Sequence, residues 1–162
     1  MKMLIPVDGS ASSVSTLKKA LQIAGNYHFS MKIITVVGPE TARSYRRNEK
    51  LWRSVDGSLL SGVNGDIEED EFTDKMRIDY EDLLSCVMKG IDFGNVYVEK
   101  EILIGDPCGV IIKTAENEHF DLIVMGNRGF SDIKSFFLGS VSQRVAAASK
   151  CPVLILHTGD ED

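Results

Sequence analysis

The sequence predicts an α/β fold: a doubly wound, five-stranded parallel sheet with the strand order 3-2-1-4-5 and helices on both faces. Five short, almost wholly apolar runs recur along the chain, as expected for strands that are buried on both faces. The segments between them carry apolar residues at helical spacing, which predicts a covering helix after each strand. Because such crossovers are right-handed, the common five-strand solution places the first and fourth strands side by side.

The strands are expected at the apolar runs themselves. Their ranges are 3–7, 32–37, 96–104, 122–125 and 153–156, with the sequences MLIPV, KIITVV, VYVEKEILI, LIVM and VLIL. Each run is short enough for a strand, and each is followed by a segment of different periodicity, except the last.

Four helices are expected between the strands. The first begins in a serine-rich stretch and ends at Gly25, where a C-terminal glycine would stop it. Its apolar face is formed by Val14, Leu17, Leu21 and Ala24. The apolar face of the second is formed by Phe72, Met76, Tyr80, Leu83, Leu84 and Val87. Asp106 and Pro107 are the cap and first-turn pair of the third, whose apolar residues are Val110, Ile111 and Ala115. The fourth is marked by Val141, Val145 and Ala148.

The composition is that of one compact domain, and we expect a single domain over residues 1–162. A net charge of −6 and a pI of about 5.1 argue against a nucleic-acid partner. No apolar run approaches the roughly 20 residues of a membrane span, and the N-terminal run is too short for a signal segment. Three scattered cysteines form neither a disulfide framework nor a metal spacing. We therefore expect a cytoplasmic protein that binds neither membrane nor nucleic acid.

One connection is longer than the others. Residues 38–71 join the second strand to the second helix and run from a basic stretch to an acidic one. We expect a mobile, solvated insertion here, in preference to a binding arm.

A glycine-containing loop follows the fourth strand, where the winding of the sheet reverses. In the predicted order, Pro6, Val7 and Asp8 face Met125 and Gly126 across a crevice. Doubly wound sheets bind their ligands in this crevice, outside the carboxyl ends of the strands. The loop therefore begins inside the expected site.

The residue types of this loop are typical of a phosphate cradle. Gly126 and Gly129 let backbone N–H groups approach an anion without interference from a Cβ atom. Gly139 and Ser140 begin the fourth helix, whose unpaired N–H groups and positive dipole end favour anions. Further donors are the side chains of Arg128, Ser140 and Ser142.

The stretch GNRGFSDIKSFFLGS resembles the GxxG(x9)G(S/T) signature of the universal stress protein family, in its ATP-binding branch. The resemblance extends over the whole chain. MLIPVDGS is similar to the family's first strand and the aspartate after it, IGDP to the start of its third helix, and CPVLIL to its last strand. The charged segment 38–71 departs from the family pattern. The resemblance implies an adenine nucleotide alpha hydrolase-like fold and a nucleotide-dependent role in stress response or signalling.

The resemblance also implies roles for single residues. Val7, Asp8 and Val36 would surround the adenine and ribose, and Met125 and Gly126 would close the crevice. The phosphates would be held by Arg128, Gly129, Gly139, Ser140, Val141 and Ser142. The implied cofactor is ATP, or AMP or ADP, with Mg²⁺ or Mn²⁺ bound through the phosphates. The implied partners are a second copy of the chain, paired through the fifth strand, and an unidentified signalling protein.

Asp8 has two interpretations. In the sequence DGSASS its carboxylate could accept backbone N–H bonds at the start of the first helix. At the switch point it could instead bind a ribose hydroxyl or a metal ion. The second interpretation is the one we favour.

No dedicated catalytic centre follows from the sequence. It contains no Walker A motif, no GxSxG elbow and no carboxylate pair placed to activate water at the phosphates. His28, His119 and His157 are expected at the surface, the first two at the opposite end of the sheet, and Cys108 is expected in the core. Alternatives to nucleotide-dependent signalling are slow ATP hydrolysis or self-phosphorylation at a site serine, flavin binding after the first strand, and a nucleotide-free dimeric scaffold.

Overall fold

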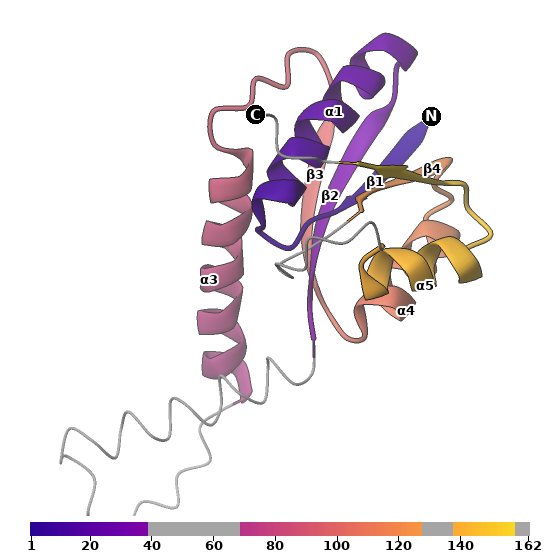
Figure 1. The fold of residues 1–162 in the computed structure, drawn as a ribbon. Coiled ribbons are helices and arrows are strands. Elements are labelled where there is room, and N and C mark those ends of the chain that lie inside the picture. Colours follow the sequence, from indigo (N-terminus) through magenta and orange to yellow (C-terminus); the bar gives the residue numbers. More distant parts are fainter. Residues whose placement is uncertain (39–68, 128–137, 158–162) are drawn as a thin grey trace, which may run out of the picture.

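The computed structural model describes residues 1–38, 69–127 and 138–157, and of residues 69–77 the backbone alone. Five parallel strands form one sheet in the order β3-β2-β1-β4-β5 (Figure 1). The strands are β1 (Lys2–Pro6), β2 (Ser30–Val37), β3 (Val98–Ile104), β4 (Leu122–Gly126) and β5 (Val153–Leu156). The helices are α1 (Ala11–Tyr27), α3 (Glu69–Met88), α4 (Pro107–Asn117) and α5 (Ser140–Ala148). The predicted fold class and strand order are confirmed.

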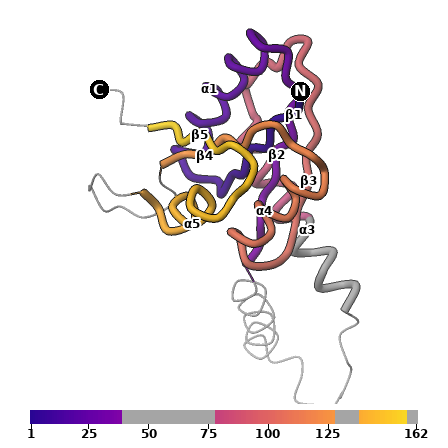
Figure 2. Tube along the Cα trace, turned by 90° about the vertical axis from the view of Figure 1, so that its right-hand side faces the viewer, coloured from indigo at the N-terminus to yellow at the C-terminus, as the bar shows by residue number. Residues whose placement is uncertain are grey.

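The helices cover both faces of the sheet. Helices α1 and α3 lie on one face and α4 and α5 on the other (Figure 1), and the view along a second direction keeps α1 apart from α4 and α5 (Figure 2). Alternate side chains of β1 therefore enter different cores: Met3 and Ile5 pack beneath α1 and α3, and Leu4 packs beneath α4 and α5. All three are fully buried, which explains why the run is continuously apolar.

The first helix ends later than the sequence predicts. Gly25 was expected to stop it, but α1 continues to Tyr27, and His28 takes the left-handed conformation with φ 57°. The N–H groups of His28 and Phe29 both donate to the carbonyl oxygen of Ala24 and close the helix end. The prediction was wrong because one left-handed residue suffices to end a helix, and here that residue is a histidine.

Helix α3 begins within the range expected to be an insertion, since Glu69 is its first residue. The rest of that range, residues 39–68, lies outside the described residues. Further along the helix, Leu84 and Val87 are buried against the sheet, as the apolar spacing predicts. Within the described parts of the chain, no helix has the length and apolar character that crossing a membrane requires.

An ion pair joins the two helices on the α4–α5 face. Asp106 caps α4 by accepting the N–H of Gly109 at 2.9 Å, and its carboxylate also accepts two bonds of 3.2 Å from the guanidinium of Arg144 on α5. The Gly109 N–H and the Arg144 guanidinium both lower the pKa of the Asp106 carboxyl below its ordinary value. Both side chains are exposed, so the bridge fixes the helix geometry more than it stabilises the domain.

We expect Asp106→Asn to destabilise the protein slightly at neutral pH and not at acidic pH. Because the folded state lowers this pKa, the carboxylate stabilises the fold above about pH 5, and the effect is lost as the pH falls through the lowered pKa. The free energies of unfolding of parent and variant, measured by urea denaturation from neutral to acidic pH, should therefore approach each other as the pH falls. Arg144→Gln should show a smaller version of the same convergence, since the Gly109 bond remains. A difference between parent and Asp106→Asn that is constant with pH would contradict this assignment.

The turn between β3 and α4 requires glycine. Gly105 has φ +150°, and a Cβ atom built on it would lie 2.7 Å from Cγ2 of Val110. Val110 is β-branched and helical, so its side chain has little freedom to move away. Gly25 is the opposite case, because it lies inside α1 with open space around its Cβ position.

We expect Gly105→Ala to lower the free energy of unfolding by about 1–3 kcal/mol, through backbone strain and overpacking. The matched substitution Gly25→Ala should raise it by roughly 0.5–1 kcal/mol, because alanine is the better helix former. Urea denaturation of the two variants beside the parent measures both. A Gly105→Ala variant as stable as the parent would contradict the requirement for glycine in this turn.

Candidate functional site

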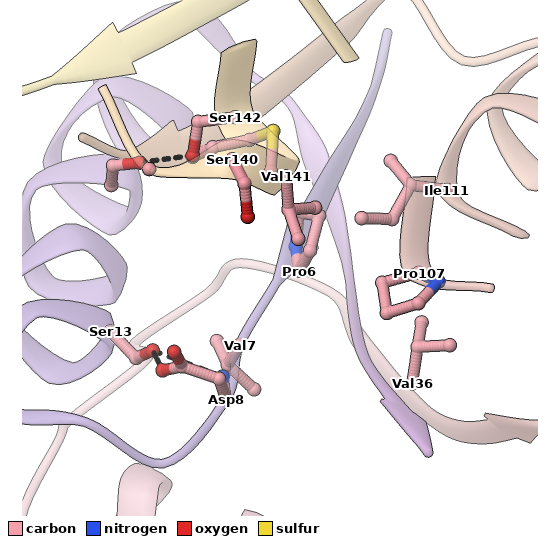
Figure 3. Close-up of a pocket in the computed structure, with 13 residues that line it drawn as sticks. Pro6, Val7, Asp8, Ser13, Val36, Pro107, Ile111, Ser140, Val141 and Ser142 are labelled. Atoms are coloured by element: carbon pink, nitrogen blue, oxygen red, sulfur yellow. Dashed lines mark hydrogen bonds between the residues drawn. The ribbon is translucent and has the colours of Figure 1, made fainter. Parts of the chain in front are cut away.

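A cavity of about 320 Å³ opens at the carboxyl ends of β1 and β4 (Figure 3). Doubly wound folds bind ligands at this switch point, and the volume lies at the lower end of the range for small-molecule sites. The predicted site residues that line the cavity are Pro6, Val7, Asp8, Val36, Met125, Gly126, Gly139, Ser140, Val141 and Ser142. The remaining two, Arg128 and Gly129, lie outside the described residues.

Three further residues line the cavity that sequence reasoning did not assign to it: Ser13, Pro107 and Ile111. Pro107 and Ile111 were predicted on the third helix, and its position at the carboxyl end of β3 could have signalled that its first turns reach the site. Ser13 belongs to the first turn of α1, where serines are ordinary helix-start residues.

One side of the cavity, facing Asp8 and Ser13, is apolar (Figure 3). Val7, Ile111 and Met125 are almost fully buried, and Val36 and Pro107 are half-buried beside them. These side chains come from β2, β4, α4 and the residue that directly follows β1, so the wall is built by segments that pack in the core. Such a wall favours an apolar group, because burial removes apolar surface from water.

One end of the cavity is the N-terminus of α5. The first intrahelical bond of α5 runs from the Gln143 N–H to the Gly139 carbonyl at 2.9 Å, which leaves the amides of residues 140–142 without helical partners. Gly139 is the cap residue and offers no side chain to satisfy them. Unpaired amides and the helix dipole favour an anion at this end.

The serines at this end have different surroundings. The Ser142 hydroxyl donates to the Gly126 carbonyl at 2.8 Å and ties α5 to the end of β4. The Gly139 N–H donates to the Asn127 carbonyl at 2.7 Å and strengthens the same junction. Ser140 is exposed and lines the cavity, and its hydroxyl has no partner among the described residues. Ser140 is therefore the hydroxyl at this end that is available to a ligand.

The other end of the cavity carries the Asp8 carboxylate (Figure 3). Gly9, with φ +87°, turns the chain after Asp8 into the start of α1. Oδ1 of Asp8 then accepts the Ser10 N–H at 3.0 Å, the Ser10 hydroxyl at 2.6 Å, and the Ser13 hydroxyl. Asp8 thus makes the local bonds that the helix-start interpretation predicts, and it also faces the cavity.

The cavity therefore differs in polarity between its ends. A ligand that fits it carries an anionic group for the α5 amides, a flat apolar part for the wall, and a hydrogen-bond donor for Asp8. Among the residues that the structure describes, no group of three or more His, Cys, Asp or Glu side chains is placed to hold a metal ion.

The other candidate reactive residues lie where the sequence places them. His28 and His119 occupy helix-to-strand connections, at the end of the sheet opposite the cavity, and both are exposed. His157 is exposed directly after β5. Cys108, in the first turn of α4, is buried in the core, as predicted.

Known proteins resemble this chain along almost all of its length. The Bacillus subtilis universal stress protein YxiE is 30% identical over 163 residues, which cover 96% of this chain and 98% of YxiE. The solved structure of the hypothetical protein MJ0577 of Methanocaldococcus jannaschii covers 99% of this chain and 97% of its own, at 22% identity and a TM-score of 0.64. A universal stress protein crystallised in complex with cAMP is similar over 98% of both chains, at 26% identity and a TM-score of 0.57.

The sequence profile of the universal stress protein family matches residues 1–157, which include every strand, every described helix and the whole cavity. The chain belongs to the universal stress protein family.

Proposed function

We propose that this protein binds ATP, or AMP or ADP, in the cavity between β1 and β4 and acts as a nucleotide-dependent stress-response or signalling module. The observation that carries the proposal is the polarity of the cavity, with α5 amides that lack intrahelical partners at one end, Asp8 at the other end and an apolar side between them. A nucleotide has a phosphate, a flat base and sugar hydroxyls, which match these three regions. The relative crystallised with cAMP, itself an adenine nucleotide, supports this ligand class.

The proposed arrangement follows the same polarity. The base lies against Val7, Val36 and Met125, and the phosphates lie at the N-terminus of α5. The groups proposed to hold the phosphates are Arg128, Gly129, Gly139, Ser140, Val141 and Ser142. Mg²⁺ or Mn²⁺ is proposed to bind through the phosphates.

The proposal gives catalysis a minor part. Of the described residues that line the cavity, Asp8 alone has an ionisable side chain, and its Oδ1 is engaged by Ser10 and Ser13. A general base for water at the phosphates needs a group within hydrogen-bond reach of that water. Slow ATP hydrolysis or self-phosphorylation and a nucleotide-free dimeric scaffold are the competing functions.

The proposal is tested with Ser140→Asp. An aspartate in the first turn of α5 favours the helix by about 0.3–1 kcal/mol but repels a bound phosphate. We expect ATP to bind the parent near or below micromolar, since about 31 heavy atoms at about 0.3 kcal/mol each give around 9 kcal/mol. Titration calorimetry should show ATP affinity falling at least roughly tenfold in the variant, with adenosine affinity unchanged.

Gln143→Glu is the matched control for that substitution. It also adds one negative charge to an exposed position of α5, but position 143 does not line the cavity. Its ATP affinity should stay close to that of the parent. If the parent binds no adenine nucleotide and releases none when denatured after purification, the proposed function is wrong and the scaffold function gains support.

We also propose that two copies of the chain pair through β5. Strand β5 forms an edge of the sheet, and all four of its side chains are partly exposed. The carbonyls of Pro152 and Leu156 accept bonds from Ile123 of β4 and from Asn127 directly after it, so strand alternation directs the N–H and carbonyl groups of Val153 and Ile155 outward. An outward edge of this kind is open to a second strand.

Light scattering at micromolar concentration should show a dimer. Ile155→Pro should convert it to a monomer, because it removes an outward N–H while the bonds to β4 remain. Ile155→Val keeps the N–H and should stay dimeric. A parent protein that scatters as a monomer would refute pairing through β5.

A further inference from the structure

We infer that Ser13 is a positioning residue for Asp8, and that the pair makes the cavity selective for nucleotides with ribose hydroxyls. The inference rests on the proposed function and goes beyond it, because it assigns Ser13 a part in ligand selection at this end of the cavity. Ser13 lines the cavity and is buried, so its hydroxyl belongs to the site and has little contact with solvent.

Ser13 holds Asp8 at two points. The N–H of Asp8 donates to the Ser13 hydroxyl oxygen at 3.0 Å, and the Ser13 hydroxyl donates to Oδ1 of Asp8. Backbone and side chain of Asp8 are thus bonded to the same oxygen atom, which restricts both the main chain and the carboxylate rotamer. A charged acceptor held in this way forms strong and directional hydrogen bonds.

The bonds within the protein all reach one oxygen of the carboxylate. Oδ1 accepts from Ser10 and Ser13, whereas Oδ2 has no partner among the described residues. Asp8 lines the cavity, so this second oxygen is the acceptor that a ligand can reach. A carboxylate oxygen accepts hydrogen bonds and cannot donate them, which requires a donor on the ligand.

The donor that fits this position is a sugar hydroxyl. With the phosphates at the N-terminus of α5 and the base against the apolar side of the cavity, the sugar 2′ and 3′ hydroxyls point away from the phosphates and are the O–H groups that can face Asp8. A site built to bond a ligand hydroxyl rejects the analogue without it, because its own acceptor is then left unpaired. The cavity should therefore distinguish ATP from 2′,3′-dideoxy-ATP.

Ser13 is the residue to test because its N–H, which the Ser10 cap accepts, remains when the hydroxyl is removed. Ser10 is the N-cap of α1 and accepts the Ser13 N–H at 3.2 Å, so replacing it would also disturb the helix start. Ser13 lies inside α1, where alanine is the better helix former. Ser15 on the same helix is exposed and does not line the cavity, which makes Ser15→Ala a matched control.

The experiment measures the affinities of ATP and 2′,3′-dideoxy-ATP for the parent, Ser13→Ala, Ser15→Ala and Asp8→Asn by titration calorimetry. The parent should bind ATP roughly tenfold or more tightly than dideoxy-ATP, because this ratio corresponds to the free energy of one hydrogen bond to a charged acceptor. Ser13→Ala should lose several-fold in ATP affinity and less than about twofold in dideoxy-ATP affinity, so that the preference shrinks. Asp8→Asn should shrink it as well, and Ser15→Ala should leave both affinities unchanged.

Binding of dideoxy-ATP also shows that a variant has kept a folded cavity. If Ser13→Ala weakens both ligands equally, Ser13 has a merely structural role and the inference is wrong. If the parent binds both ligands equally, Asp8 forms no selective hydrogen bond with the sugar hydroxyls. The inference then fails while the proposed nucleotide function stands. If the parent binds neither ligand, the proposed function fails and the inference fails with it.

Discussion

Backbone pairing between β1 and β4 is the interaction on which the candidate site depends. Met3 pairs with Leu122 and Leu4 with Ile123, although more than a hundred residues separate these strands in the chain. Their adjacency brings the turn after β1 and the segment after β4 to one edge of the sheet, where neither could form a cavity alone. Helices α4 and α5 then complete the wall, and the Asp106–Arg144 ion pair joins them close to it.

The two ends of this cavity, the α5 amides and the Asp8 carboxylate, differ in polarity because of ordinary backbone geometry. Parallel strands place their carboxyl ends together, and β1 and β4 are each followed by the N-terminus of a helix, so α1 and α5 both start at the cavity. At the start of α1, the side chains of Asp8 and Ser10 accept the N–H groups of Ser10 and Ser13. At the start of α5, the cap residue is a glycine, which has no side chain to accept an N–H group. Two equivalent helix ends thus differ in what they offer a ligand.

Much of this architecture could be predicted from the sequence, because continuous apolar runs, helical spacing and right-handed crossovers leave few topologies. The cavity residues at the ends of β1 and β4 followed from the topology, since the ends of paired strands must meet, whereas Val36 and Val141 were expected there only through the family resemblance. Ser13 could not be assigned in the same way: its approach to Asp8 depends on the positive φ of Gly9 and the first turn of α1, which are tertiary details. The prediction that α1 ends at Gly25 was wrong for a related reason. Composition alone does not determine which residue takes the left-handed position at a helix end, and His28 takes it here.

The cavity touches both hydrophobic layers of the domain. Val7 belongs to the core beneath α1 and α3, whereas Ile111 and Met125 belong to the core beneath α4 and α5. A ligand held there contacts both layers, and its binding free energy adds to the resistance of the whole domain to unfolding. Since unfolded molecules are the ones that cellular proteases remove, ligand occupancy would also govern how long each copy of the protein persists.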